Sequence, residues 1–325
     1  MVDRRTRYHV LLTVLAVLPA MPVPAWSWGC EGHQTIALIA RTHLSAAADR
    51  HVRELLEPSP IAADLPRGCP SGGDDLLVQA ATWADDVRGA AASPFFGTGH
   101  WHFIDLPRGS AAGDITRFCP ARNGCLVTAI EQQMAALRAP VTDQQRAAET
   151  LMLLVHLVGD LHQPLHCITN DDGGGNCVPV TYFGSVPRLS PEPDSVIYQP
   201  NLHAVWDTSI IRRIMWHRSP AWLASVLEQR FAARIGSWQR LPVDIRAWAW
   251  ESHRVAEHTA YGQLPVPLPV ESSQRQSRCA DVARRILPLH ERLGQRYQDA
   301  AVPVIEEQLA KGGVRLAMVL NQVWP

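Results

Sequence analysis

The sequence predicts an all-α fold, with one mainly helical domain, long loops and at most a short β-hairpin. Three observations support this prediction. Apolar residues recur at helical spacing through most of the chain, no segment repeats, and no linker separates two cores. The 325 residues are 46% hydrophobic and 19% charged, which is enough apolar material for the core of one large domain.

The clearest helix is predicted for residues 142–161. Thr142 or Asp143 can cap its first turn. Residues 151–158 are apolar almost all round, which is typical of a central buried helix, and Pro164 ends the helical run. The same apolar spacing predicts the other helices. In chain order, the predicted helices are 32–44, 74–88, 126–137, 142–161, 204–217, 221–235, 243–258 and 300–323.

Residues 170–201 differ from the rest of the chain. They are rich in Gly and Pro, which interrupt regular structure, and only residues 178–183 resemble a strand. We expect a long loop here, with one hairpin at most.

The N-terminal residues 1–27 have the pattern of a cleaved signal peptide. Three arginines precede the short apolar run 10–18, and small residues stand at the −1 and −3 positions of a cleavage site after Ser27. The apolar run is about half of the ~20 residues that a membrane span needs. An uncleaved membrane anchor is the alternative. Cleavage would leave residues 28–325 as one domain that begins at Trp28.

The seven cysteines fit a secreted protein, in which disulfides can form. We expect pairs that enclose short loops, with one cysteine left over because the number is odd. The expected pairs are Cys119 with Cys125, Cys167 with Cys177 and, from a more distant pair of positions, Cys30 with Cys69, which leaves Cys279 free.

The charge balance excludes two classes of protein. The formal net charge is −1, so the chain is no polybasic nucleic-acid binder that works by bulk charge. Lys311 is its only lysine, and no phosphate-binding loop of the Walker type can be built around it. The 14 histidines instead indicate metal chemistry.

Two pairs of His and Asp share one spacing. His156 and Asp160 lie four residues apart in the predicted central helix, and His203 and Asp207 repeat the interval, so each pair shares a helix face and can bind a divalent ion. One such pair is often only a side-chain hydrogen bond. A buried carboxylate needs a partner, however, and a metal cluster would satisfy both pairs.

Beyond these pairs, the sequence resembles a known family, the S1/P1 nucleases. These are secreted, tri-zinc, single-strand-specific nucleases related to bacterial zinc phospholipases C, with a mainly helical fold of the phospholipase C/nuclease type. Together the matching stretches are specific, and they cover nearly all of residues 28–325. They are Trp28-Gly29-x-x-Gly32-His33, WADDVR (83–88), HFID (102–105), VHLVGDLHQPLH (155–166), GGN (174–176), NLHAVWDT (201–208) and LAKGGVRLA (309–317).

The resemblance implies three Zn²⁺ ions and nine ligand residues. Asp85, His102, His156 and Asp160 would hold the first ion, His166, His203 and Asp207 the second, and Trp28 and His33 the third, with Asp160 bridging the first and third. Trp28 would bind through its α-amine and carbonyl oxygen. Because cleavage alone exposes that amine, removal of the signal peptide would complete the site.

The resemblance also implies a reaction: zinc-activated hydroxide cleaves single-stranded DNA and RNA to 5′-phosphorylated products, with 3′-nucleotidase activity in addition. Asp85 and Asp160 would hold the metals of catalysis, and Arg88 would stabilise charge on the phosphate. Arg88 could equally form an ordinary salt bridge on a helix.

Base binding would fall to Phe103, Asp105 and Asn176. Phe103 would stack on an unpaired base, Asp105 would accept hydrogen bonds from the base edge, and Asn176 would assist. The alternatives are a core phenylalanine and an aspartate that caps a loop.

The implied partners are single-stranded nucleic acid and nucleotides, for a monomeric protein that is secreted or periplasmic and has no stable membrane association after cleavage. Two other functions stay open. A zinc phospholipase C shares the metals but, by resemblance, has Glu where Asp207 stands. A non-catalytic secreted zinc-binding protein is the second.

Overall fold

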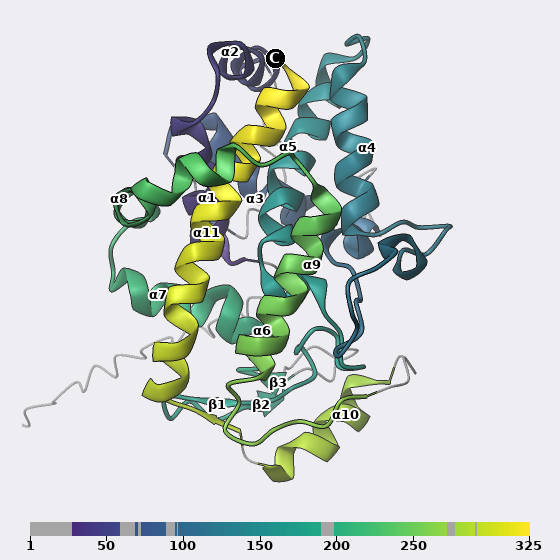
Figure 1. Cartoon of the computed structure of the whole chain (residues 1–325), viewed down its shortest axis with the longest axis vertical. Helices are drawn as coiled ribbons and strands as arrows, with labels where there is room; N and C mark the ends of the chain where they lie inside the picture. The colour runs from purple at the N-terminus through teal and green to yellow at the C-terminus, as the bar shows by residue number, and fades with distance from the viewer. Residues whose placement is uncertain are drawn as a thin grey trace, which may run out of the picture.

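The computed structural model describes residues 28–58, 69–70, 73–88, 95, 97–189, 198–271, 277–289 and 291–325. Helices dominate this part of the chain, so the predicted all-α class is confirmed (Figure 1). The predicted signal peptide, residues 1–27, lies outside the described residues. Among the described residues, no helix is both long and apolar enough to cross a membrane.

The helices include all eight that the sequence predicts. The α-helices are α1 Cys30–Thr42, α2 Ala46–Leu56, α3 Leu76–Arg88, α4 Leu126–Arg138, α5 Gln144–Leu161, α6 Leu202–Ala204, α7 Ile210–Met215, α8 Pro220–Gln239, α9 Ile245–Val255, α10 Cys279–Ile286 and α11 Gln295–Val323. The 3₁₀ turns are η1 Thr98–His102, η2 Ile115–Phe118, η3 Pro164–Cys167 and η6 Leu287–Leu289, and the π-helical turns are η4 Val205–Ser209 and η5 Ala256–Tyr261.

Two of these helices, α2 and α10, are additional to the predicted set. In α2 the buried residues Ala48, Val52, Leu55 and Leu56 have helical spacing, and Ser45 caps the first turn by accepting a hydrogen bond from the N–H of Ala48. The pattern was therefore present in the sequence, but it is interrupted by the charged residues of the exposed face.

Helix α5 lies at the centre of the helical bundle. It packs against α3, α4, α1 and α11, and its second half is buried on every side, as the all-round apolar pattern predicts. Helix α11 runs along the molecule and crosses α1 and α8. Gly312 and Gly313 in α11 permit the contact with α1, because a Cβ at either position would press on Ile36 or Ile39 of α1.

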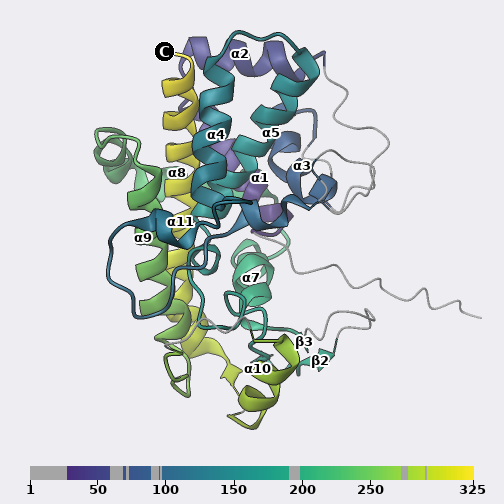
Figure 2. The same ribbon diagram turned by 90° about the vertical axis from the view of Figure 1, so that its right-hand side faces the viewer.

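The short strands lie at the end of the molecule opposite α2, together with α10 (Figure 2). β1 Thr181–Tyr182 pairs in parallel with β4 Arg292–Leu293, and β2 Arg188–Leu189 pairs antiparallel with β3 Tyr198–Gln199. The second pair agrees with the single hairpin expected between residues 170 and 201. The first brings together segments distant in sequence, and nothing local predicts it.

The disulfides correct one prediction. The expected pairs Cys30–Cys69 and Cys119–Cys125 are confirmed. The pairing of Cys167 with Cys177 is wrong, and so is the free thiol at position 279, because Cys177 bonds to Cys279. Cys167 is free and buried, with its thiol toward the carbonyl of Leu161. The bond joins the start of α10 to the turn at Cys177 from 102 residues away, and loop length gave no sign of it.

Candidate metal centre

Helix α5 presents His156 and Asp160 on one buried face. Both side chains are inaccessible to solvent, and His156 Nε2 lies 3.2 Å from Asp160 Oδ2. The interval of four residues produces this contact, as the sequence predicts. Because the helix is surrounded by other helices, the carboxylate of Asp160 is available only to groups that those helices bring to it.

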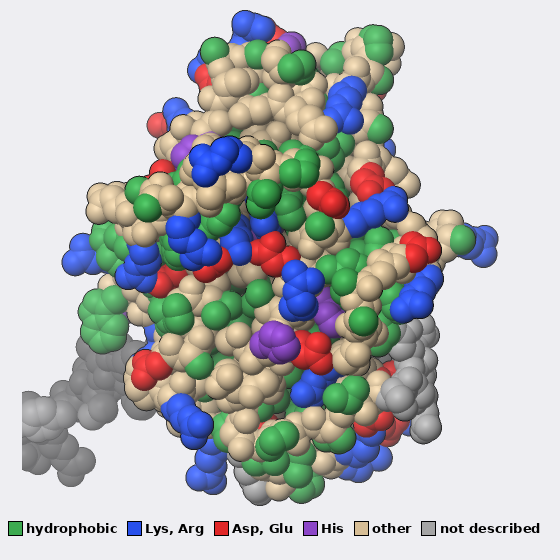
Figure 3. Space-filling model, viewed as in Figure 1, with side chains coloured by type: hydrophobic (Ala, Val, Ile, Leu, Met, Phe, Trp, Pro, Cys, Tyr) green, Lys and Arg blue, Asp and Glu red, His purple; other side chains and the backbone are tan. Residues whose placement is uncertain are grey.

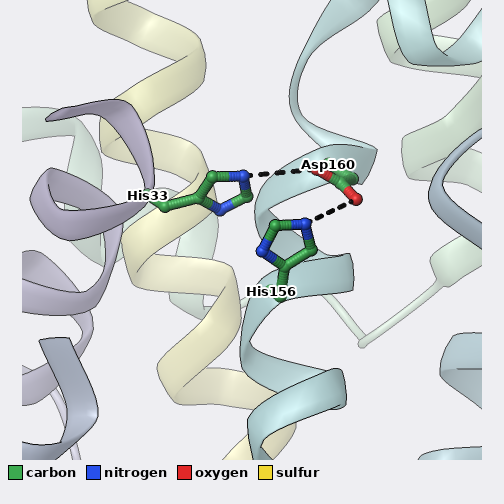
Figure 4. A group of neighbouring side chains, drawn as sticks. All are labelled: His33, His156 and Asp160. Atoms are coloured by element: carbon green, nitrogen blue, oxygen red, sulfur yellow. Dashed lines mark ion pairs between the residues drawn. The ribbon is translucent and has the colours of Figure 1, made fainter. Parts of the chain in front are cut away.

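Helix α1 brings His33 to the same carboxylate (Figure 4). His33 Nε2 lies 3.3 Å from Asp160 Oδ1, and the rings of His33 and His156 stack with centroids 4.0 Å apart. Gly159 makes room for this ring, because a Cβ there would lie 2.6 Å from His33 Nδ1. The glycine therefore positions an imidazole that is 126 residues away in the sequence.

Helix α3 and the turn η1 add Asp85 and His102 on the other side of His156. His102 Nδ1 lies 2.9 Å from Asp160 Oδ2 and 3.1 Å from His156 Nε2. Asp85 Oδ1 lies 3.7 Å from His102 Nδ1 and 3.6 Å from His156 Nε2. Nitrogen atoms of His33, His102 and His156 thus surround the Asp160 carboxylate, and Asp85 contacts two of these histidines.

A second cluster is built from η3 and the helical segment that starts at α6. His203 Nε2 lies 3.3 Å from Asp207 Oδ2 and 3.2 Å from His166 Nε2. The π-helical turn η4 follows His203 and contains Asp207, and such turns are often found at functional sites. Gln163 donates a hydrogen bond from its amide to Asp207 Oδ1. Gln163 was not among the predicted site residues, although a polar glutamine directly before Pro164 in an otherwise buried segment indicates a partner for a buried group.

The orientation of the imidazoles tests whether these clusters fit a cation. The Nδ1 atoms of His156, His166 and His203 donate to the carbonyl oxygens of Ala81, His102 and Gly174, respectively. In the neutral ring this leaves the lone pair on Nε2. The lone pairs of His166 and His203 therefore face each other and a carboxylate, an arrangement that is repulsive without a positive charge between them. Backbone partners of this kind are typical of histidines that bind metals.

Among the described residues, the ligand atoms fall into three groups, each with its atoms within 4.8 Å of one another. The groups are His33 with His156 and Asp160, Asp85 with His102 and His156, and His166 with His203 and Asp207. The donors are imidazole nitrogens and carboxylate oxygens, which is the ligand chemistry that Zn²⁺ accepts. The residues therefore fit the metals that the resemblance implies.

The protonation of the site follows from burial and charge. Burial lowers the pKa of His33 and of His166. Burial also acts to lower the pKa of His156, but the charges of Asp160 and Asp85 outweigh it and raise that pKa to about 9. Burial acts to raise the pKa of Asp160, but the charges of His156 and His166 hold it well below its usual range. Asp160 is accordingly an anion at neutral pH.

Trp28 lies beside the second cluster. Its side chain is fully buried, and the N–H of the next residue, Gly29, donates to the carbonyl oxygen of Asp207 at 2.8 Å. The start of the described chain is therefore held against the segment that carries the ligands. Arg88 is the last residue of α3, but its side chain lies outside the described part of the structure.

The three residues predicted to bind a base differ in exposure. Phe103 is 41% exposed, so the alternative of a core phenylalanine is wrong. Asn176 is half-buried, and its amide donates to the carbonyl of Gly173. Asp105 is exposed, but neighbouring protein atoms partly desolvate its carboxyl group, and this desolvation, with the charge of Asp172, raises the pKa of Asp105 to about 6.

Asp172 is a further residue of this region that the sequence analysis did not assign to the site. It is buried, and both of its oxygens lie 2.9 Å from the hydroxyl of Tyr261, which donates to the carboxylate. The N–H groups of Asn170 and Gly175 donate to Asp172 Oδ1. These bonds hold the glycine-rich turn whose Gly174 carbonyl orients His203.

Comparison with known proteins identifies the family of this chain. The model of the S1/P1 Nuclease family matches residues 28–325. Nuclease S1 of Aspergillus oryzae is 27% identical over 334 residues, covering 96% of this chain and 97% of its own length. Endonuclease 4 of Arabidopsis thaliana is 26% identical, with coverage of 92% and 90%, and Nuclease P1 of Penicillium citrinum is 25% identical, with coverage of 91% and 97%. The chain, with its helical fold and three His/Asp groups, belongs to the S1/P1 nuclease family.

Proposed function

We propose that the protein is a zinc-dependent endonuclease that hydrolyses single-stranded DNA and RNA to 5′-phosphorylated products and also acts as a 3′-nucleotidase. One observation carries the proposal: the imidazole lone pairs and carboxylates of three neighbouring groups converge on buried positions, in a chain of a nuclease family. Such clusters of electron pairs need cations, and cations at this site would face a phosphodiester substrate.

The ligand assignment proposed here is that of the sequence analysis. Asp85, His102, His156 and Asp160 hold one zinc ion, His166, His203 and Asp207 a second, and Trp28 with His33 a third, to which Asp160 also binds. Bound zinc supplies the Lewis acidity that activates water and neutralises phosphate charge. The chain's own contribution is to orient the ligands through the carbonyls of Ala81, His102 and Gly174.

The residues around the metals bind the substrate. The exposed ring of Phe103 offers a stacking face, which only an unpaired base can reach, and this is the source of the single-strand preference. Asp105 accepts hydrogen bonds from the base edge, and Asn176 assists it. Arg88 at the end of α3 stabilises charge on the phosphate.

Residues 1–27 are proposed to be a signal peptide whose removal frees the Trp28 amine. The burial of Trp28 beside the Asp207 segment supports this role, because the amine would start next to the ligands. Three disulfides support an oxidising compartment, so we place the protein outside the cytosol, secreted or periplasmic, as a monomer.

The decisive experiment compares the chain beginning at Trp28 with the same chain carrying one extra N-terminal residue. We expect three zinc ions per chain and hydrolysis of single-stranded DNA for the first form, and two zinc ions with strongly reduced activity for the second. Full activity of the extended form would refute the role of Trp28. Hydrolysis of phosphatidylcholine without hydrolysis of DNA would instead establish a phospholipase C. Fewer than two zinc ions with no hydrolysis at all would establish a non-catalytic protein.

A further inference from the structure

An exposed cluster of aromatic and basic side chains lies where α7 ends. Trp216 is 73% exposed, the largest exposed fraction among the large hydrophobic residues of the described chain. The ring of His217 contacts it edge-on. One turn earlier, the guanidinium of Arg213 lies 3.6 Å from the centre of the Phe183 ring, which is itself 38% exposed. We call Phe183, Arg213, Trp216 and His217 the Trp216 patch.

The backbone of this patch ends helix α7 in the left-handed conformation with residue types that rarely adopt it. Trp216 and His217 are consecutive residues with left-handed backbone conformations, at φ values of 46° and 65°. A helix normally ends with Gly or Asn in this conformation, because a Cβ is unfavourable there. A large ring that is mostly in water does not repay this cost through core packing. Such a local exception is typical of a binding surface.

The charges of the patch are available to a ligand. In the described part of the chain, neither Arg213 nor the adjacent Arg218 forms an ion pair, whereas the neighbouring Arg212 is paired with Glu31. On the face shown in Figure 3, basic and acidic side chains are interspersed. Arginine planes that lie on exposed aromatic rings provide both stacking and positive charge, which is the combination that single-stranded nucleic acid requires.

The patch and part of the proposed metal centre lie on the same helical segment. One helical segment, formed by α6, η4 and α7, carries His203 and Asp207 at its start and Arg213 near its end. Trp216 comes nine positions after Asp207 in the chain, which corresponds to about 14 Å along a helix. A stacked strand rises ~3.4 Å per nucleotide, so this distance is about four nucleotides.

We propose that the Trp216 patch binds the substrate strand a few nucleotides away from the scissile phosphate, as a site separate from the base contacts of Phe103 and Asp105. A base stacks on Trp216, and Arg213 contacts the phosphates while it remains stacked on Phe183. The inference rests on the proposed nuclease function, and it specifies the substrate as a strand several nucleotides long. A lipid surface is the competing occupant of an exposed tryptophan beside arginines.

The test uses the zinc-loaded chain beginning at Trp28, with the variants Trp216→Ala and Trp216→Tyr and the control Leu241→Ala, an exposed apolar residue outside the patch. For a 20-nucleotide oligothymidylate, we expect Trp216→Ala to lower kcat/KM roughly 5- to 100-fold, the loss typical of one base–aromatic stack. For the dinucleotide, which cannot reach the patch, kcat/KM stays unchanged. Trp216→Tyr retains most of the activity, and Leu241→Ala retains all of it.

Binding gives a second readout that does not depend on turnover. Anisotropy of a labelled 20-nucleotide phosphorothioate strand, whose cleavage is slow, is measured against salt. Arg213→Ala should reduce the slope of log affinity against log salt by about 0.7, the contribution of one phosphate contact on a single strand.

The possible outcomes distinguish a failure of the patch proposal from a failure of the proposed nuclease function. If the parent chain cleaves DNA but Trp216→Ala leaves long-strand hydrolysis and binding unchanged, the patch proposal is overturned and the nuclease stands. If no nucleic acid is cleaved but strand binding depends on Trp216, the patch is a single-strand binding surface and the proposed nuclease function is wrong. If Trp216→Ala weakens binding to vesicles of phosphatidylcholine and phosphatidylglycerol and leaves strand binding unchanged, the occupant is a membrane and the proposal is wrong.

Discussion

Two histidines at the end of α5 show how tertiary neighbours decide the chemistry of one residue type. His156 and His162 are six residues apart, both are inaccessible to solvent, and both donate from Nδ1 to a backbone carbonyl, of Ala81 and of Val158, at 2.8 Å. Their Nε2 atoms differ. That of His156 faces the Asp160 carboxylate, whereas that of His162 accepts a hydrogen bond from Arg315.

The difference appears in their protonation. Burial acts to lower the pKa of both rings. The carboxylates around His156 outweigh burial and raise its pKa to about 9, whereas the charge of Arg315 adds to burial and lowers the pKa of His162 to about 3. The lone pair of His162 is already used by an arginine that Glu251 holds in place. His162 is therefore a structural residue, whereas His156 can act as a ligand when a cation displaces the proton that the carboxylates hold on its ring.

The largest effect is expected from exchanging the two histidines for glutamine separately. His156→Gln should remove at least one zinc ion and lower hydrolysis of single-stranded DNA by more than about 100-fold, because loss of an outer partner of a ligand alone typically costs 10- to 100-fold. His162→Gln should change activity by less than about fivefold, since an amide oxygen can accept the Arg315 hydrogen bond. Zinc analysis and kcat/KM for both variants check this. Equal losses of zinc and activity in the two variants would contradict the assignment of His156 as a ligand and His162 as a structural residue.

The next effect concerns Gly159, which lies between the two histidines. Gly159→Ala places a methyl group on the His33 ring, so we expect loss of one zinc ion and an activity loss of about 10- to 100-fold. Gly236→Ala in α8 is the matched control, because a Cβ there meets nothing closer than the Arg240 side chain at 3.6 Å. It should leave activity unchanged and raise helix stability slightly. A Gly159→Ala protein that keeps its full zinc content would show that the glycine does not position His33.

The arginine that faces His162 should affect stability and leave the chemistry intact. Arg315→Met removes the partner of His162 and one partner of Glu251, which keeps Lys311. We expect the free energy of unfolding in urea to fall by about 2–4 kcal/mol, with normal activity per zinc-loaded chain. Arg234→Met breaks the more exposed pair with Glu307 and should cost less than about 1 kcal/mol. The contrast between buried and exposed charge fails if the two losses are the same.

The smallest effect is expected at Asp105 in the proposed base site. There, too, a neighbouring charge shifts a pKa, but this charge is negative. With its pKa raised to about 6, Asp105 is ionised above that pH and protonated below it. The ratio of kcat/KM between the parent chain and Asp105→Asn should therefore fall by about fivefold as the pH drops through 6, because a charged acceptor binds a base edge more strongly than a neutral one. Bis(p-nitrophenyl) phosphate, which has no base, should give a flat ratio. A flat ratio for dinucleotides too would exclude Asp105 from base binding.

Much of the fold was predictable from local pattern. Apolar spacing identified the eight principal helices, including the buried helix α5, because helix geometry converts that spacing directly into a buried face. It did not identify the parallel pairing of β1 with β4 or the Cys177–Cys279 disulfide. Both join segments about 100 residues apart, and local spacing contains no information on which distant segments meet.

In the candidate site, too, some contacts were predictable from the sequence and others were not. By itself, the sequence determined that His156 lies against Asp160 and that His203 lies against Asp207, because residues four apart share a helix face whatever surrounds the helix. Resemblance supplied the remaining ligand candidates. Only the tertiary structure decided that His33 and His102 reach the Asp160 carboxylate and that Asp85 reaches His102. It also decided that Gly159 leaves room for His33 and that His162 faces an arginine. The physical reason is that protonation and ligand capacity depend on the charges within a few ångströms of a buried ring, and packing places those charges.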